Sequence, residues 1–208
     1  MPKTHGGILA GGAGLRLGLG IPKALAPLAG LTLLERAIAT LSEVCDTVTV
    51  SMSPARPLPA ALLGAATLVV DPPNAEGPLA GLIAALSSGA WDRAIVLGVD
   101  FPLARPAALR ELLSHLEGNA AVLPAPGGRL QPLLAAYSRA GFQQLATAFA
   151  DGRRSVVGPV TALGGKVLDD ATLAGFPGGL ENWFNVNTPA DLVEAARRLE
   201  ARKGGEAA

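Results

Sequence analysis

A glycine-rich segment near the N-terminus carries the strongest chemical signal in the sequence. Two cations, Arg16 and Lys23, follow its opening residues, which are Leu9, Ala10, Gly11 and Gly12. Glycines allow a backbone to fold closely around an anion with its amides pointing inward, and fixed positive charges strengthen that binding. The spacing is neither the GxGxxG dinucleotide fingerprint nor a P-loop, because no GK[ST] follows the glycines. The segment predicts a triphosphate site, with an ordinary glycine turn as the simpler alternative.

A single carboxylate follows the most apolar strand-like run. Asp100 comes directly after residues 94–99 (AIVLGV) and precedes Phe101 and Pro102. A side chain at the carboxyl end of a buried strand lies at the crevice where open α/β sheets bind ligands. Magnesium in proteins is commonly held by one or two carboxylates together with phosphate oxygens. We therefore predict that Asp100 binds Mg²⁺ and nucleotide; the alternative is a turn residue ahead of Pro102.

Two further groups of polar residues lie at element boundaries. Asp71 directly follows the strand-like run 67–70, and Gly77 opens the next helix. The Asp71 carboxylate and the backbone near Gly77 could recognise the sugar or base of a nucleotide. Asn185 and Asn187 precede the last helix and could contact an acceptor or supply a second metal contact. Each group is equally well explained as turn-forming sequence, so both interpretations stay open.

Composition excludes several classes of protein. Seventeen basic and seventeen acidic residues cancel, which removes the electrostatic footprint of a general nucleic-acid binder. One cysteine and two histidines exclude a disulfide and a Cys/His zinc site by count, so a catalytic metal would need oxygen ligands. No run approaches the roughly 20 apolar residues of a membrane span. No signal-peptide pattern opens the sequence, so a cytoplasmic location without membrane association is expected.

Strand-like and helix-like patterns alternate along the chain. Strands are predicted over 7–10, 47–52, 67–70, 94–99, 120–123 and 184–186, and helices over 31–44, 79–87, 106–117 and 138–151, with a last helix starting after Thr188 and Pro189. Such alternation favours a parallel sheet covered by helices on both faces. The expected fold is a three-layer α/β/α, Rossmann-like arrangement with a mostly parallel sheet. We predict one domain, 1–203, and a frayed tail, 204–208.

The ordered motifs resemble those of the molybdenum cofactor guanylyltransferases (MobA), within the nucleotidyltransferase superfamily. The resemblance covers nearly the whole chain and rests on the glycine-rich segment with Arg16, Gly18 and Lys23, then Gly77-Pro-Leu-Ala-Gly81, Asp100-Phe-Pro, Gln131-Pro-Leu and the stretch 184–192 (FNVNTPADL). It implies the nucleotidyltransferase form of the fold. It also implies Mg²⁺-dependent transfer of GMP from GTP to the molybdenum cofactor (Mo-molybdopterin), with release of pyrophosphate.

The resemblance also assigns roles to residues. Leu9, Ala10, Gly11 and Lys23 would bind GTP, Asp71 would contact the nucleotide, and Asp100 would bind both nucleotide and Mg²⁺. Ser51 is a further nucleotide-binding candidate, because it stands where family members often carry Asn after the second strand. Arg16 and Lys23, together with Mg²⁺ held by Asp100, would act in catalysis by neutralising phosphate charge.

Other functions remain open at this point. A cytidylyltransferase or a sugar-phosphate nucleotidyltransferase could use the same fold. A noncatalytic GTP-binding accessory protein is a different class. A monomer with transient contacts to cofactor-biosynthesis proteins is expected.

Overall fold

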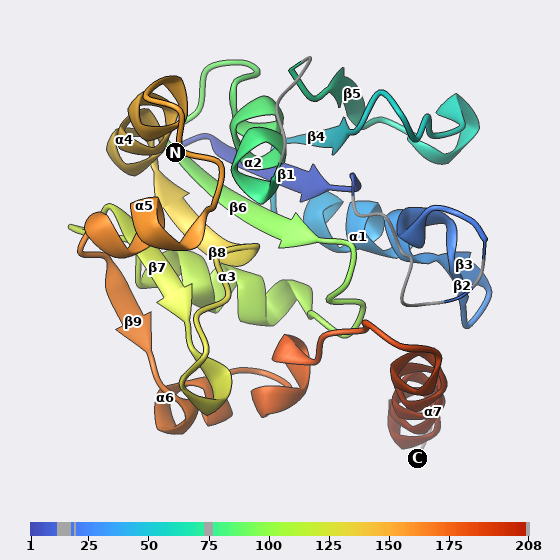
Figure 1. The fold of residues 1–208 in the computed structure, drawn as a ribbon. Coiled ribbons are helices and arrows are strands. Elements are labelled where there is room, and N and C mark those ends of the chain that lie inside the picture. Colours follow the sequence, from blue (N-terminus) through green and yellow to red (C-terminus); the bar gives the residue numbers. More distant parts are fainter. Residues whose placement is uncertain (12–17, 19, 73–76, 207–208) are drawn as a thin grey trace.

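The computed structural model describes residues 1–11, 18, 20–72 and 77–206, in which seven strands form one sheet. Its order is β5-β4-β1-β6-β8-β7-β9 (Figure 1). β8 runs antiparallel to both of its neighbours, and every other pairing is parallel, so the predicted mostly parallel sheet is confirmed. The strands are β1 (Thr4–Leu9), β4 (Thr47–Met52), β5 (Thr67–Val70), β6 (Arg93–Gly98), β7 (Ala121–Pro124), β8 (Leu134–Ser138) and β9 (Lys166–Leu168).

Helices cover both faces of the sheet, which gives the predicted α/β/α layers (Figure 1). Along β6, Ile95 and Leu97 belong to one apolar cluster and Ala94 and Val96 to the other, because successive side chains of a strand point to opposite faces. The first cluster includes residues of α1 (Leu33–Ser42), α3 (Pro106–Ser114) and α7 (Pro189–Glu206). The second includes residues of α2 (Pro78–Leu86), α4 (Arg139–Ala150) and α5 (Val157–Ala162).

Short elements connect these layers. The strands β2 (Pro27–Leu28) and β3 (Leu31–Thr32) form a separate antiparallel pair. The remaining elements are α6 (Asp170–Ala174) and the 3₁₀ turns η2 (Lys23–Leu25), η3 (Ala60–Leu62), η4 (Pro126–Gly128) and η5 (Gly179–Trp183). Within the described ranges, no helix is both long enough and apolar enough to cross a lipid bilayer.

Local capping explains where the helices begin. The Thr32 side chain accepts a hydrogen bond from the amide of Glu35, whose carboxylate accepts one from the Thr32 amide, which forms a capping box for α1. Ser138 caps α4 in the same position. Thr188 and Asp191 exchange backbone-to-side-chain bonds at the start of α7, as the sequence predicts. These caps satisfy amides that a helix leaves without partners in its first turn.

The structure corrects several predicted boundaries. No strand forms over 184–186. The Val186 amide donates a hydrogen bond of 2.8 Å to the carbonyl of Asp100, but a single bond does not form the ladder of a β-strand. The predicted helices 31–44 and 106–117 are shorter, at Leu33–Ser42 and Pro106–Ser114. α7 extends to Glu206, and the domain bounds 1–203 and the frayed tail 204–208 stay predictions. β8 and β9 were not predicted.

Candidate active site

A cavity of about 530 Å³ lies beyond the carboxyl ends of β5, β4, β1 and β6. Its lining includes these predicted site residues: Leu9, Gly11, Lys23, Ser51, Asp71, Gly77 and Asp100. Each follows or ends one of these strands, or opens the helix or turn that comes next. The sheet therefore gathers residues from segments far apart in the chain at one crevice, which is where open α/β sheets bind ligands.

Lys23 and Asp100 meet inside this cavity. Lys23 begins η2 after Pro22 and is only 9% exposed, and its Nζ lies 3.6 Å from Oδ2 of Asp100. The same ammonium donates a hydrogen bond of 3.1 Å to Oδ1 of Asn187. The glycine-rich segment and the end of β6 thus reach one point of the site, although they are far apart in sequence.

Asp71 is held at the β5 side of the cavity. β4 and β5 pair in parallel register, and the Asp71 amide continues the ladder by bonding to the carbonyl of Met52 at 2.8 Å. The hydroxyl of the buried Ser51 donates a hydrogen bond of 2.7 Å to Oδ1 of Asp71. On the other side, a Cβ added at Gly11 would lie 3.2 Å from Oδ2. The carboxylate is therefore fixed between the ends of β1 and β4.

The cavity also contains residues that sequence reasoning missed. Arg56, in the loop after β4, donates from Nη1 to the carbonyl of Gly11 at 2.9 Å. It therefore ties the start of the glycine-rich segment to the neighbouring loop and adds a cation to the lining. The sequence held a signal for Arg56, because ligands bind beyond the carboxyl ends of strands and Arg56 lies in the loop after β4. Pro78 and Gly81, which belong to the motif that begins at Gly77, also line the cavity, and the further lining residues not predicted are Ser53, Ala55, Gly98, Val99 and Leu133.

Two glycines of the cavity lining leave room for neighbouring side chains. A Cβ at Gly81 would lie 3.0 Å from Oγ of Ser51, so α2 can approach the end of β4 closely. A Cβ at Gly98 would overlap Oδ1 of Asp100. Because glycine has no Cβ, these two positions leave space for the observed conformations of the Ser51 and Asp100 side chains.

The other predicted residues that the structure describes are not among the residues that line the cavity. Ala10 is 1% exposed, and its amide donates to the carbonyl of Ser51 at 2.9 Å, so it joins the ends of β1 and β4. Asn185 accepts a hydrogen bond of 2.7 Å from Nδ2 of Asn187, which links it to Lys23 through one intermediate. Gly12 and Arg16 lie outside the described residues.

The start of α7 fixes Asn187. The carboxylate of Asp191 accepts bonds of 2.8 Å from the amides of Asn187 and Thr188. The backbone hydrogen bond from Asn187 is the main cause that holds the pKa of Asp191 below its usual range, and the nearby charge of Lys23 adds to it. The ionised cap thus holds the backbone that presents Asn187 to Lys23.

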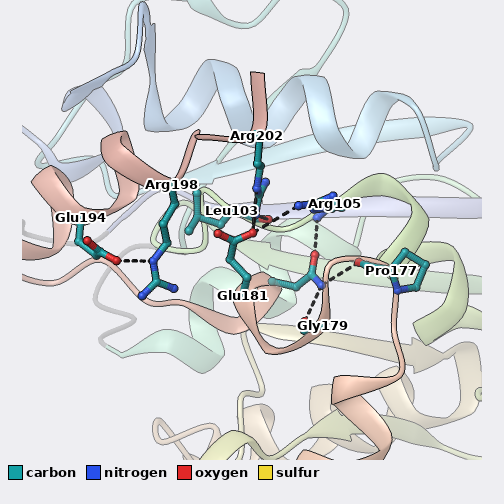
Figure 2. A network of polar contacts seen from close by, with 9 residues as sticks. Leu103, Arg105, Pro177, Gly179, Glu181, Glu194, Arg198 and Arg202 are labelled. Carbon is teal, nitrogen blue, oxygen red and sulfur yellow. Dashed lines mark hydrogen bonds and ion pairs between the residues drawn. The ribbon is translucent and has the colours of Figure 1, made fainter. Parts of the chain in front are cut away.

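A polar network docks the C-terminal segment on the loop after Asp100, as Figure 2 shows. Arg202 of α7 donates to Oε2 of Glu181 at 2.7 Å and to the carbonyl of Leu103 at 2.9 Å. The buried Asn182 accepts from the amide of Arg105 at 2.9 Å. Glu181 also pairs with Arg105 at 3.4 Å. These bonds hold the chain that runs on to Asn187 against the loop that follows β6.

The donor atoms suit a hard cation. Asp100 offers carboxylate oxygens, and Asn185 and Asn187 offer amide oxygens close by. Among the residues that the structure describes, no three His, Cys, Asp or Glu side chains form a metal cage. A Mg²⁺ ion here would take one carboxylate and complete its shell with water and substrate phosphates, which is its usual mode of binding. The residues present fit that ion.

Comparison with known proteins agrees with this geometry. Residues 6–164 match the family model of the MobA-like NTP transferase domain. The molybdenum cofactor guanylyltransferase of Acidiphilium cryptum is 36% identical over 194 residues, which cover 91% of this chain and 93% of that protein. That of Desulfosudis oleivorans is 28% identical over 203 residues, 97% of this chain and 98% of the relative.

A solved structure agrees as well. The crystal structure of molybdopterin-guanine dinucleotide biosynthesis protein A from Archaeoglobus fulgidus has a TM-score of 0.76 and 26% identity to this chain. The match covers 95% of this chain and 99% of that one. The chain belongs to the MobA-like NTP transferase domain family and is a nucleotidyltransferase.

Proposed function

We propose that this protein transfers GMP from GTP to the phosphate group of Mo-molybdopterin. An oxygen of the acceptor phosphate attacks the α-phosphorus of GTP, a new P–O bond forms, and the bond to the β-phosphate oxygen breaks. Pyrophosphate leaves, and the product is the guanine dinucleotide form of the cofactor. The names of the relatives support the substrates, and the chemistry of the cavity supports the reaction type.

One observation carries the proposal: Gly11, Lys23 and Asp100 line a single cavity, with Lys23 Nζ 3.6 Å from the Asp100 carboxylate. A phosphate-binding backbone, a fixed cation and a metal-binding carboxylate are the parts that phosphoryl transfer requires. The reaction needs no general base. A phosphate monoester with a second pKa of about 6 is already largely dianionic at neutral pH.

The residues of the chain then have separate tasks. Lys23 would neutralise phosphate charge, and Arg56 would hold the glycine-rich segment in place through the Gly11 carbonyl. Asp71, oriented by Ser51, would contact the nucleoside at the far end of the cavity. Asp100 would hold Mg²⁺, and Asn187, which contacts the same Lys23 ammonium, would offer a further oxygen donor. When bound, Mg²⁺ would neutralise the developing charge and fix the phosphates for in-line attack.

A panel of the four nucleoside triphosphates tests the proposal, with pyrophosphate release as the readout. We expect release with GTP and Mg²⁺, and only when Mo-molybdopterin is also present. Reactions without acceptor measure background hydrolysis. Preference for CTP would instead identify a cytidylyltransferase, and turnover with a sugar phosphate as acceptor would identify a sugar-phosphate enzyme of the same fold. GTP binding without pyrophosphate release under any condition would identify a noncatalytic accessory protein.

A further inference from the structure

The Lys23 ammonium contacts the oxygens that would bind the metal. It lies 3.6 Å from Oδ2 of Asp100 and donates to Oδ1 of Asn187 at 3.1 Å. Carboxylate and amide oxygens are the ligands that Mg²⁺ prefers. A divalent cation on these oxygens and an ammonium in contact with them would repel each other strongly in a partly buried site.

We infer that Lys23 is an internal counter-ion that competes with the divalent metal for Asp100 and Asn187, so that the metal binds tightly only together with the nucleotide. This inference rests on the proposed function for the identity of the metal site. Lys23 lines the same cavity as Gly11, and its long side chain can move from the carboxylate to a phosphate. Nucleotide binding then frees Asp100 and Asn187 at the moment when phosphate oxygens arrive to complete the metal's shell.

Burial makes this competition effective. The Lys23 side chain is 11% exposed and that of Asp100 is 23% exposed, so solvent screens the pair only in part. The start of α7 and the network at Arg202 hold Asn187 and the loop after Asp100 in place. The two oxygens are therefore fixed, and the ammonium is the part that can leave.

Removing the Lys23 ammonium should therefore strengthen metal binding. Removing the ammonium removes a cation within Coulombic reach of the metal, and because solvent screens these charges only in part, the expected gain in affinity is about tenfold. We expect Lys23→Met to bind Mn²⁺ about tenfold more tightly than wild type when no nucleotide is present. Lys23→Arg keeps the charge and should not show the gain.

The measurement is Mn²⁺ affinity of the full chain, by electron paramagnetic resonance of the free ion, with and without a nonhydrolysable GTP analogue. In wild type, the analogue should tighten Mn²⁺ binding, and by linkage Mn²⁺ should tighten analogue binding by the same factor. In Lys23→Met this coupling should shrink. Lys3→Met removes an exposed lysine and controls for the general change in net charge. Lys23→Gln serves as a second neutral variant if the circular dichroism spectrum of Lys23→Met is not native.

Two outcomes separate this inference from the proposed function. Combining Asp100→Asn with Lys23→Met should abolish the gain in Mn²⁺ affinity; if it does not, Asp100 is not the metal ligand and the proposed site itself is wrong. If Asp100→Asn alone removes Mn²⁺ binding but a folded Lys23 variant binds Mn²⁺ no better than wild type, the metal site stands and the competition is refuted.

Discussion

The hydroxyl of Ser51 donates a hydrogen bond of 2.7 Å to Oδ1 of Asp71 and so joins the ends of β4 and β5 at the edge of the cavity. Ser51 is 1% exposed, and Gly81 packs against it so closely that a Cβ there would lie 3.0 Å from its Oγ. In the proposed function the serine would therefore act on the nucleotide through Asp71, which it orients. Asp71 is an acceptor-only group when ionised, and guanine offers N–H donors to such a group.

Replacing Ser51 tests this arrangement. Ser51→Ala removes a hydrogen bond to a charged group that is worth about 1.5–3 kcal/mol within the protein, and because bound GTP would feel only part of that free energy, we expect KM for GTP to rise by up to about tenfold while kcat changes little. Ser51→Thr keeps the hydroxyl and should recover much of the loss if the added methyl is accommodated. Steady-state kinetics of pyrophosphate release give both constants. An unchanged KM in Ser51→Ala would show that the hydrogen bond from Ser51 to Asp71 does not contribute to GTP binding.

Asp100→Asn tests the metal-binding role. The substitution removes the charge but keeps the shape, and loss of one electrostatic contact to a transition state typically costs about 10²–10³ in kcat. The side chain is partly exposed at the end of β6, so we expect the melting temperature to change little. Asp151→Asn, at an exposed position at the end of α4, is the matched control and should retain full activity. Full activity in Asp100→Asn with Mg²⁺ present would refute the assignment.

Gly77→Ala tests the tight entry to α2. Gly77 has φ 92° and ψ 165°, a backbone region that is essentially restricted to glycine and costs another residue about 1–3 kcal/mol, and an added Cβ would lie 2.7 Å from the carbonyl oxygen of Arg154. Gly152 has φ +88° with nothing within 4 Å of an added Cβ, so Gly152→Ala introduces strain without the collision. We expect the larger drop in melting temperature, and weaker GTP binding, in Gly77→Ala only. Equal effects in thermal melts and calorimetry would show that the contact with Arg154 is unimportant.

His5 should make stability depend on pH. Burial is the main cause that lowers the pKa of His5 below its usual 6.5, and the charge of Arg139 adds to this. The unfolded chain then takes up a proton before the folded protein does, so the free energy of unfolding should fall as pH drops below about 6.5, by at most about 1.4 kcal/mol per pH unit.

Urea unfolding at pH 7.5 and pH 5.5 measures the effect of His5. His5→Gln cannot take up the proton and should lose that part of the pH dependence, although it will be less stable because the ring bonds to Thr47 and to the Ala85 carbonyl are altered. Both measurements avoid the range below pH 5, where carboxylates titrate. The same slope in wild type and variant would show that another group is responsible.

Much of the fold follows from local sequence signals. The strands 47–52 and 67–70 coincide with β4 and β5, because β-branched residues in alternation carry their own strand preference. Thr188 and Asp191 mark the start of α7, because a cap depends only on residues within one turn. Lys23 and Asp100 could be selected for the same reason: each follows a strand and has the charge that phosphate or metal binding needs.

Contacts between distant segments could not be predicted from local sequence. β8 was missed because its sequence, LAAYS, is rich in alanine, which has little strand preference of its own; it is a strand because β6 and β7 pair with both of its edges. The reverse holds at 184–186, where a strand-like sequence finds no neighbouring strand to pair with. Three hydrogen bonds of the site likewise depend on which loops the sheet brings together. They join Arg56 to the Gly11 carbonyl, Ser51 to Asp71 and Lys23 to Asn187. Most helices and strands, and the residue types that could bind phosphate and metal, follow from local sequence, because strand preference, caps and charge are local properties. Which of those residues meet depends on the strand order and register, which are properties of the whole packed sheet.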